Sequence, residues 1–202
     1  MAGWPGGRPF RSSLGDWQTA LIDSSWILKA CRPHASCCVD LHLRTPSRSS
    51  IATPADPVVT RYLSWPTHRT LANTHAFLAW SDEDREKWPA GSYLVFSRED
   101  NALLGGTGLS FKSLTCAVTG YVLARNAWGH GYATESLHAM VDLVGKLGVK
   151  RLEAICHIDH RASARVLEKC GFQLEEILRK HTEFPNVALG PKSDVLCYVR
   201  CF

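Results

Sequence analysis

Residues 126–136, NAWGHGYATES, form the stretch that decides how the rest of the chain is interpreted. Gly129 and Gly131 flank a histidine, and small residues lead from them into an apolar pattern of helical period. Glycine permits positive φ and a close approach of the main chain to a ligand. A helix that starts at such a turn presents unpaired amide groups, which favour anions such as phosphates. These residues alone fit an anion-binding site and a strand-to-helix turn without a ligand equally well.

The size and composition of the chain predict a single soluble domain. It has 202 residues, of which 45% are hydrophobic and 21% charged, as in ordinary globular proteins. No run of eighteen apolar residues indicates a membrane span. The first residues lack the apolar core and cleavage site of a signal peptide. The net charge of +4 is too weak and too scattered to predict nucleic-acid binding.

Eight cysteines do not form a recognisable metal site. There is no Cys-x-x-Cys pair, and the cluster of Cys31, His34, Cys37 and Cys38 lacks the second ligand pair that a zinc site needs. The remaining cysteines fall inside apolar patterns, where a free thiol behaves as a small hydrophobe. We therefore expect reduced thiols, no metal and a cytoplasmic location.

Hydrophobic periodicity divides the chain into two unequal parts. No period persists through the first fifty-five residues, and we expect residues 1–38 to be an atypical N-terminal segment. Strand-like patterns cover residues 39–44, 92–97, 102–111, 116–124, 149–157, 172–179 and 194–200. Helical patterns cover residues 68–84, the stretch from the two glycines to Gly148, and residues 160–170 between a cap at Asp159 and a stop at Gly171. This order predicts a mixed α/β domain with a mostly antiparallel sheet.

Two familiar glycine loops fit the opening stretch poorly. A P-loop needs Lys and Ser or Thr after its glycines, whereas Tyr132 and Ala133 follow Gly131. A dinucleotide fingerprint is partly matched, with Thr134 at the third small position and Glu153 about twenty residues after the turn. That fingerprint follows the first strand of a parallel βαβ unit, however, and here the turn follows an antiparallel meander. A nicotinamide-dependent oxidoreductase is therefore disfavoured.

The later segments, taken in order, resemble a known family. VTRYLSW, LLGGTGLSF, TGYVLARNAWGHGYATES, RLEAICHIDHRASARVLEKCGF and DVLCYVR are similar to blocks of the GNAT acetyltransferase superfamily, in its RimJ/RimL-type branch. The resemblance spans residues 58–200 and implies the acyl-CoA N-acyltransferase fold over residues 39–202, with a central, mostly antiparallel sheet and flanking helices. Its first strand and first helix have only residues 41–44 as a counterpart in front of this region.

The resemblance also implies acetyl-CoA as co-substrate, held by its pyrophosphate on residues 127–133 and by its pantetheine arm along residues 121–124. The expected contacts are Val122, Leu123, Ala124, Arg125, Asn126, Trp128, Gly129, His130, Gly131, Tyr132, Ala133, His160 and Ser163. For Trp128, core packing at the turn is the stronger expectation. Two positions depart from the family: Asn126 stands where Gln or Arg is usual, with Arg125 next to it, and His160 stands in place of an Asn.

Transfer of acetyl from a thioester to an amine needs a neutral amine, a stabilised oxyanion and a proton for the thiolate. The resemblance assigns the proton to Ser163, whose alternative role is to help start its helix. Glu153 and Glu183 are candidate bases, with His157 and His160 as further candidates. The expected reaction is direct attack in a ternary complex by a protein N-terminal α-amine, ribosomal or other, or by a small amine. We expect a monomer or a homodimer.

A second class of function is open on the sequence. The family's N-terminal elements are shortened here, His160 stands in place of an Asn, and there is no obvious base. The fold could therefore bind CoA without catalysing transfer, as a regulatory module. Release of CoA in the presence of amines distinguishes the two.

Overall fold

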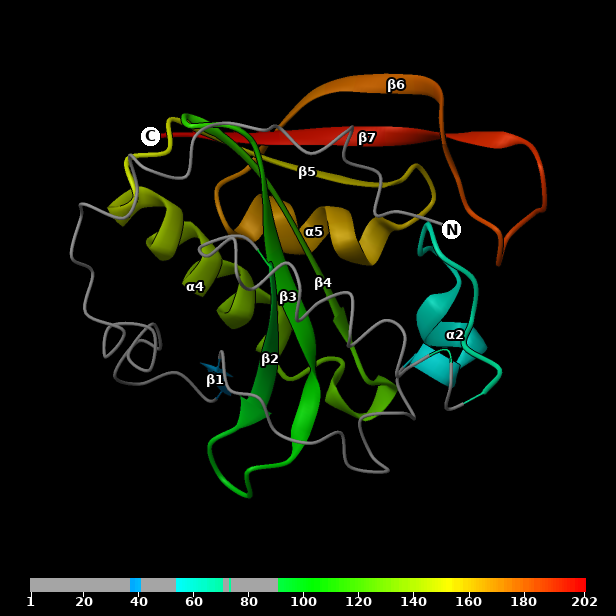
Figure 1. The fold of residues 1–202 in the computed structure, drawn as a ribbon, viewed down its shortest axis with the longest axis horizontal. Coiled ribbons are helices and arrows are strands. Elements are labelled where there is room, and N and C mark those ends of the chain that lie inside the picture. Colours follow the sequence, from blue (N-terminus) through cyan, green and yellow to red (C-terminus); the bar gives the residue numbers. More distant parts are fainter. Residues whose placement is uncertain (1–36, 41–53, 71–72, 74–90) are drawn as a thin grey trace.

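The computed structural model describes residues 37–40, 54–70, 73 and 91–202, and the structural statements below concern these residues (Figure 1). Three α-helices and a 3-10 turn are present: α2 (Pro57–Thr60), η3 (Arg125–Ala127), α4 (Tyr132–Lys146) and α5 (Arg161–Lys169). The strands are β1 (Cys37–Asp40), β2 (Gly91–Ser97), β3 (Leu103–Ser113), β4 (Cys116–Leu123), β5 (Arg151–His157), β6 (Gln173–Glu183) and β7 (Lys192–Cys201).

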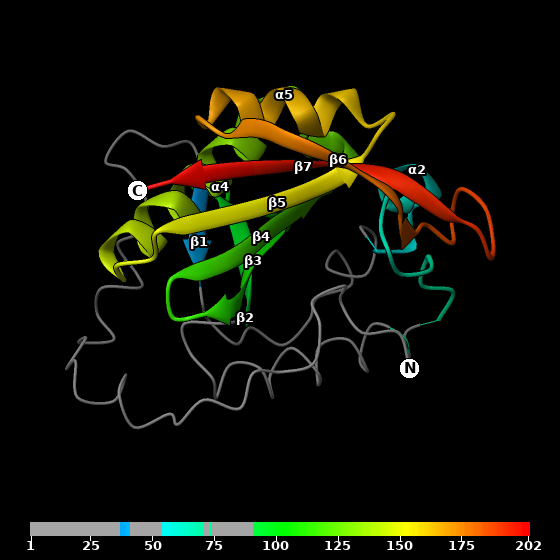
Figure 2. The same ribbon diagram turned by 90° about the horizontal axis from the view of Figure 1, so that it is seen from above.

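The strands form one sheet in the order β1-β2-β3-β4-β5-β7-β6. Every neighbouring pair is antiparallel except β4 and β5, which are joined by α4 and run parallel. Figure 2 shows α4 and α5 on the same face of the sheet. The α4 crossover between adjacent parallel strands is the connection that a βαβ unit requires. The predicted mixed, mostly antiparallel sheet is confirmed.

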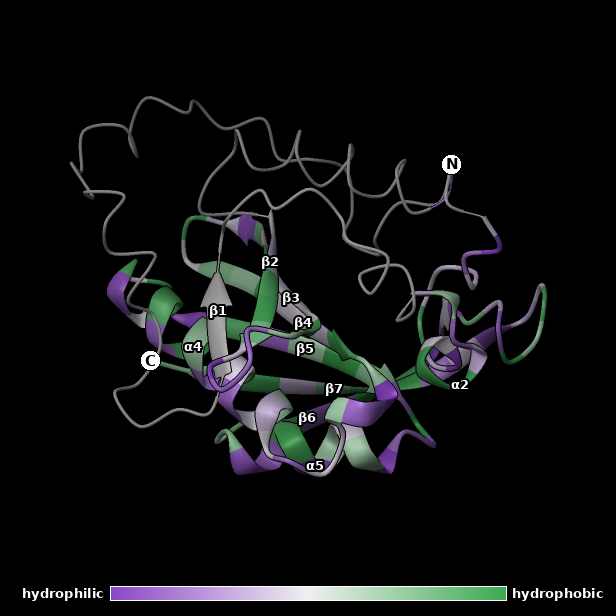
Figure 3. Cartoon of the chain, turned by 90° about the horizontal axis from the view of Figure 1, so that it is seen from below, coloured by the Kyte–Doolittle hydropathy of each residue, from purple (hydrophilic) through white to green (hydrophobic). Residues whose placement is uncertain are grey.

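The core lies between this sheet face and the two helices. Leu137, Met140 and Val144 recur on one side of α4 and are fully buried, and they pack in the same cluster as Leu152 of β5 and Leu167 of α5. The ribbon of α5 alternates hydrophobic and hydrophilic residues, as expected for a helix that packs by one face (Figure 3). Burial of this apolar stripe fixes α4 and α5, and with them the residues at their N-terminal ends.

The two parallel strands separate after a short contact. Residues 116–118 of β4 pair with residues 151–153 of β5, whereas β5 pairs with β7 along its whole length. Figure 1 shows β4 and β5 running apart beyond this point. Among the described strands, β3 is therefore the only partner of β4 from Thr119 to Leu123. The other edge of this part of β4 faces the space between the separated strands β4 and β5, which we call the gap.

The predicted strands from residue 92 onward and the helices ending near Gly148 and Gly171 are confirmed, while three details differ. Strand β1 includes Cys37 and Cys38, so two residues of the 1–38 segment belong to the sheet. β6 continues past residue 179 to Glu183, because a register shift between Leu178 and Thr182 lets the strand resume its pairing.

The cap of α5 is the third difference. His160 is the N-cap, with no side-chain hydrogen bond, and Asp159 lies one residue earlier. The Asp159 amide donates to the His157 ring, which holds this residue in the turn before the helix. Residues 41–44 and nearly all of the predicted helix over 68–84 lie outside the described residues. Within the described part of the chain, no helix is long and apolar enough to span a membrane.

Candidate active site

The glycine turn that precedes α4 has the conformation expected from its sequence. Gly129 and Gly131 have φ of 80° and 87°, which L-residues with a side chain rarely adopt. Gly131 is the N-cap of α4, and no side chain caps this end. The first intrahelical bond runs from the Glu135 amide to the Gly131 carbonyl at 3.0 Å, so the preceding amides lack intrahelical partners. A Cβ at either glycine would meet nothing within 4 Å, which leaves space for a ligand.

The main-chain amides at the end of β4 point alternately toward β3 and toward the gap. The Ala124 amide donates to the Leu104 carbonyl on the β3 side at 2.8 Å. Because consecutive residues of a strand point their amides to opposite edges, Val122 also faces β3, and Tyr121 and Leu123 face the gap. The Leu123 carbonyl already accepts the Trp128 indole N–H at 2.9 Å. Of the predicted pantetheine contacts, Tyr121 and Leu123 thus present main-chain amides to the gap, and Val122 and Ala124 do not.

The prediction of core packing for Trp128 is wrong. The residue is 45% exposed, and the preceding Ala127, at 2%, is the residue of the turn that enters the core. The hydrogen bond of the indole to Leu123 holds the ring over the end of β4 instead. Asn126 and His130 are also exposed, and the His130 ring stacks against Tyr132 with centroids 5.9 Å apart.

Arg125, next to the unusual Asn126, has a partner on another element. Its guanidinium donates to Asp56 Oδ1 at 2.6 Å, and Asp56 also caps α2 through the Val58 amide. The hydrogen bond from Arg125 and that from the Val58 amide lower the pKa of Asp56. Arg125 therefore fastens the start of α2 to the turn before α4.

Ser163 lies in the first turn of α5 and contacts β4 across the gap. Its Oγ is 3.0 Å from the Tyr121 hydroxyl, which also lies 3.4 Å from the Ser163 carbonyl oxygen. Burial raises the pKa of Tyr121, so the phenol stays protonated. The Cys156 thiol is on the same side, where burial raises its pKa to about 11 although a Ser163 hydrogen bond opposes the shift. The sequence placed Tyr121 on the cofactor strand but missed its contact with Ser163.

Glu153, a predicted base, is held by two cations. Arg151 Nε donates to Glu153 Oε1 at 2.7 Å, and Lys112 donates to Oε2. Burial alone would raise the pKa of Glu153, but the hydrogen bonds from Lys112 and Arg151 lower it below its usual value. A carboxylate in this setting is a weak base. Its position twenty-two residues after Gly131 gave no sign of these partners, which come from β3 and from its own strand.

The other candidate bases lie around the far end of β5. His160 precedes α5 and stacks on Tyr62, with ring centroids 4.8 Å apart. Burial, and then the nearby His157, lower the pKa of His160, so its ring is neutral at pH 7. Glu183 is exposed at the end of β6, and the next residue, Phe184, is buried with its ring 4.8 Å from that of His157.

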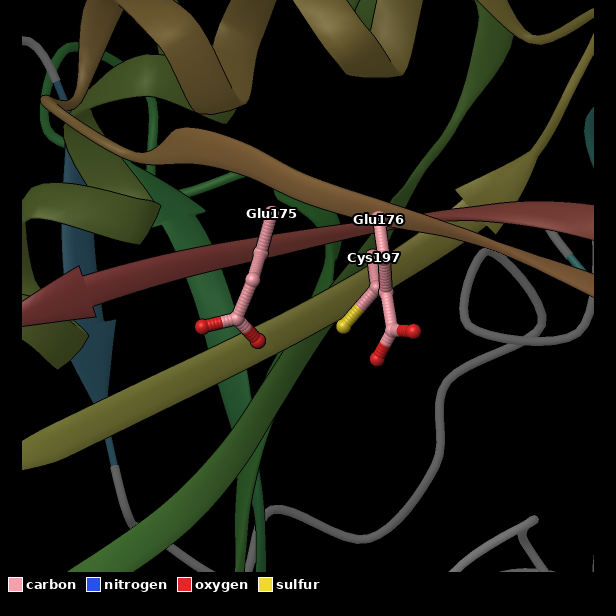
Figure 4. A group of neighbouring side chains, drawn as sticks. All are labelled: Glu175, Glu176 and Cys197. Atoms are coloured by element: carbon pink, nitrogen blue, oxygen red, sulfur yellow. The ribbon is translucent and has the colours of Figure 1, made fainter.

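A group of metal-ligand residues lies elsewhere, on β6 and β7 (Figure 4). The ligand atoms of Glu175, Glu176 and Cys197 are within 4.8 Å of one another. The Arg151 guanidinium donates to both oxygens of Glu175, at 2.8 Å to Oε1. Burial and then the neighbouring carboxylates raise the pKa of Cys197, which keeps it as a thiol rather than the thiolate that binds metals. Of the three residues, Glu175 is already paired with the Arg151 cation.

The comparisons with known proteins agree with this geometry. The acetyltransferase (GNAT) domain family matches residues 40–173. An uncharacterized N-acetyltransferase, p20, from Bacillus licheniformis is 25% identical over 130 residues, which cover 63% of this chain and 73% of that protein. A probable N-acetyltransferase, YjcK, from Bacillus subtilis is 35% identical over 98 residues, 46% of this chain and 54% of the relative.

Solved structures show the same fold. A GNAT-family acetyltransferase from Bacillus anthracis has a TM-score of 0.72 at 18% identity, covering 83% of this chain and 95% of that one. RimL, the ribosomal L7/L12 alpha-N-protein acetyltransferase, in complex with coenzyme A has a TM-score of 0.69 at 21% identity, with the same coverage. Spermidine N-acetyltransferase from Vibrio cholerae, in complex with CoA and spermine, has a TM-score of 0.65 at 13% identity, covering 82% and 95%.

The chain thus has the acyl-CoA N-acyltransferase fold. The open edge of β4 lies beside the start of α4, which no side chain caps. The chain belongs to the GNAT acetyltransferase family and is an N-acetyltransferase. The presence of RimL among the similar folds accords with the resemblance to the RimJ/RimL-type branch.

Proposed function

We propose that this protein transfers the acetyl group of acetyl-CoA to the α-amine of a protein N-terminus, by direct attack in a ternary complex. The observation that carries the proposal is the end of β4–β5 pairing at Val118. It leaves the β4 edge open directly beside the uncapped start of α4. The turn amides can bind a pyrophosphate, and the open edge can pair with the amide groups of a pantetheine arm. Structures of similar fold contain CoA, which supports this choice of ligand.

The chain's own residues account for the chemical steps. The amine nitrogen attacks the thioester carbon, and a main-chain amide at the gap, from Tyr121 or Leu123, stabilises the oxyanion. The C–S bond then breaks, and Ser163 gives its hydroxyl proton to the departing thiolate. Tyr121, 3.0 Å away, orients this hydroxyl and stays protonated, and Ser163 regains its proton from water. The proton lost by the amine goes to His160, to Glu183 or to water.

The absence of a strong base near Ser163 in the described chain favours an α-amine as acceptor. An α-amine has an ordinary pKa of about 7.7–8.0 and is partly neutral at pH 7, whereas a lysine amine, at about 10.4, needs more help. Glu153 is engaged by Lys112 and Arg151 and has no part in this proposal.

The test is mass spectrometry of three acceptors after incubation with acetyl-CoA. They are a lysine-free peptide with a free N-terminus, a peptide with a blocked N-terminus and one lysine, and spermidine. We expect acetylation mainly of the first peptide. Preferred acetylation of lysine or spermidine would contradict the acceptor assignment. CoA binding without transfer to any amine would support the non-catalytic alternative.

A further inference from the structure

An aromatic cluster lies at the end of β5, beside the start of α5. The Tyr62 ring stacks on His157 and on His160, with centroids 4.9 Å and 4.8 Å apart, and Phe184 meets His157 edge-on at 4.8 Å. Cys156 points into the core beneath α5, so the next strand residue, His157, points to the other face. The His157 imidazole is therefore in contact with two rings from distant segments of the chain, Tyr62 and Phe184.

The segment that carries Tyr62 is held in place by a single side chain of the β6–β7 connection. The Asn186 amide nitrogen donates to the Thr60 and Trp65 carbonyls at 2.8 Å and 2.9 Å, on either side of Tyr62. The Asn186 oxygen accepts from the Thr67 amide at 2.9 Å. The cluster is thus a built feature of the fold, because its members are fixed by hydrogen bonds beyond their ring contacts.

The hydrogen bond of His157 determines its tautomer. The Asp159 amide donates to Nδ1 at 3.1 Å, so Nδ1 presents a lone pair and the neutral ring carries its proton on Nε2. This makes His157 a donor, and it removes the ring from the candidate bases, since Nε2 has no lone pair to offer. The carboxylate of Asp159 lies 3.8 Å from Nδ1 and would pair with the ring only after protonation.

The donor has no protein acceptor among residues 37–40, 54–70, 73 and 91–202. The bond to Nδ1 is the single hydrogen bond of the ring there, although the side chain is only 6% exposed. A buried N–H group without an oxygen partner is uncommon and points to a ligand that supplies one. Of the other carboxylates at this end of the sheet, Asp56 and Asp194 are each paired with an arginine, whereas Glu183 is exposed.

We propose that His157 donates its Nε2–H to a carbonyl oxygen of the acceptor, so that the acceptor is an amine next to a carbonyl, as at the N-terminus of a peptide. The proposal rests on the proposed function and makes His157 a specificity residue. The thioester is polarised by main-chain amides at the gap, while His157 faces the opposite side of the sheet. A peptide carbonyl satisfies the donor, and a polyamine, which has no oxygen, does not.

The experiment compares an alanine tripeptide amide with its E-alkene isostere, which has the same shape but lacks the first carbonyl oxygen and the amide N–H bonded to it. In the wild-type protein, kcat/KM for the peptide should exceed that for the isostere by about tenfold, the effect of one hydrogen bond to a buried donor. His157→Phe keeps a ring but removes the donor, so it should lower kcat/KM for the peptide alone. His157→Gln restores an N–H and should recover part of the preference. His181→Phe, an exposed position on β6, is the matched control.

Equal activity of the wild-type protein on both acceptors, or an equal loss on both in His157→Phe, would overturn the inference and leave the acetyltransferase function standing. Activity on neither acceptor would overturn both. A nitrogen-15 NMR spectrum of the wild-type protein gives a readout that needs no variant. A proton on Nε2 of His157 is expected, and a proton on Nδ1 of the neutral ring would refute the donor role.

Discussion

The Tyr121 hydroxyl lies 3.0 Å from Ser163 Oγ, and this contact joins β4 to α5 across the gap where β4 and β5 have separated. Both groups are placed by the core: Tyr121 packs against it from the strand, and Ala164, next to Ser163, is buried beneath α5. A hydroxyl that must give up a proton at one point in space needs such an external constraint. The pair therefore connects the fold to the proposed chemistry.

Ser163→Ala tests the proton donor. If the hydroxyl protonates the departing thiolate, turnover at saturating acetyl-CoA should fall by about a hundredfold or more, with little change in CoA affinity, because the interaction strengthens in the transition state. Steady-state kinetics and calorimetric titration with CoA measure the two quantities. A role in starting the helix would instead reduce stability by about 1 kcal/mol and leave turnover nearly intact, which would contradict the assignment.

Tyr121→Phe tests the orientation of that serine. Turnover should fall by about tenfold, since loss of one hydrogen bond leaves the Ser163 hydroxyl free to rotate. Tyr198→Phe is the matched control: Tyr198 is also buried, and its hydroxyl donates to Glu168 on α5 at 2.8 Å, outside the gap. Both variants should lose similar stability in thermal unfolding. If they lose equal turnover, Tyr121 has no specific role.

Gly131→Ala tests whether the turn before α4 binds the pyrophosphate of CoA. The φ of 87° strains any residue with a Cβ by about 1–2 kcal/mol, and relief of this strain would shift the turn amides away from the ligand. Gly148, at the other end of α4, has φ of 73° and equally open surroundings, so Gly148→Ala carries the same backbone cost. Only Gly131→Ala should weaken CoA binding measured by calorimetry. Equal CoA affinity in the two variants would remove the turn from the site.

Much of the fold could be predicted from the sequence because short local patterns indicate where its helices, strands and turns begin and end. The helical period after Gly131, the stop at Gly148 and the hairpin turn at residues 98–101 each depend on neighbours in sequence. The glycine turn was identified in the same way, since its positive φ is a property of glycine itself. These signals needed no knowledge of distant residues.

The contacts that decide the role of each side chain are of another kind. Glu153 resembles a base in the sequence, and only the fold brings Lys112, forty-one residues earlier, onto its carboxylate. Trp128 resembles a core residue in the sequence, but in the structure its indole nitrogen donates to the Leu123 carbonyl. The stacking of Tyr62 on His157 and His160 joins segments almost a hundred residues apart, which no local pattern encodes.

Glu153→Gln tests the structural role of that carboxylate through pH. Its pKa is lower in the folded protein than the value of about 4.3 in the unfolded chain, so the charge stabilises the fold above that value. This contribution should disappear as pH falls through the folded pKa. At pH 7 the variant should melt a few degrees below wild type, and the two melting temperatures should converge once the pH is below the lowered pKa of Glu153. Turnover should change little. A large loss of turnover with an altered pH–rate profile would instead restore Glu153 as a base.

Asn186→Ala tests the attachment of the segment that carries Tyr62. The Trp65 carbonyl and the Thr67 amide lose this partner, and the Thr60 carbonyl keeps the Leu63 amide, so the free energy of unfolding should fall by about 1–3 kcal/mol. The control is Asn73→Ala, because among the described residues the Asn73 side chain bonds to its neighbours Arg69 and Thr70. Denaturant unfolding of both variants gives the comparison. Equal stability of Asn186→Ala and wild type would show that other contacts hold the segment.

The central claim is that CoA lies against the start of α4 and along the open edge of β4, with its sulfur at Ser163. The most direct measurement is a crystal structure of the protein with CoA. The account predicts diphosphate oxygens within hydrogen-bond distance of main-chain amides in residues 129–134, the pantetheine arm beside Tyr121 and Leu123, and the thiol next to Ser163 Oγ. A diphosphate bound away from this turn, or a thiol remote from Ser163, would contradict it.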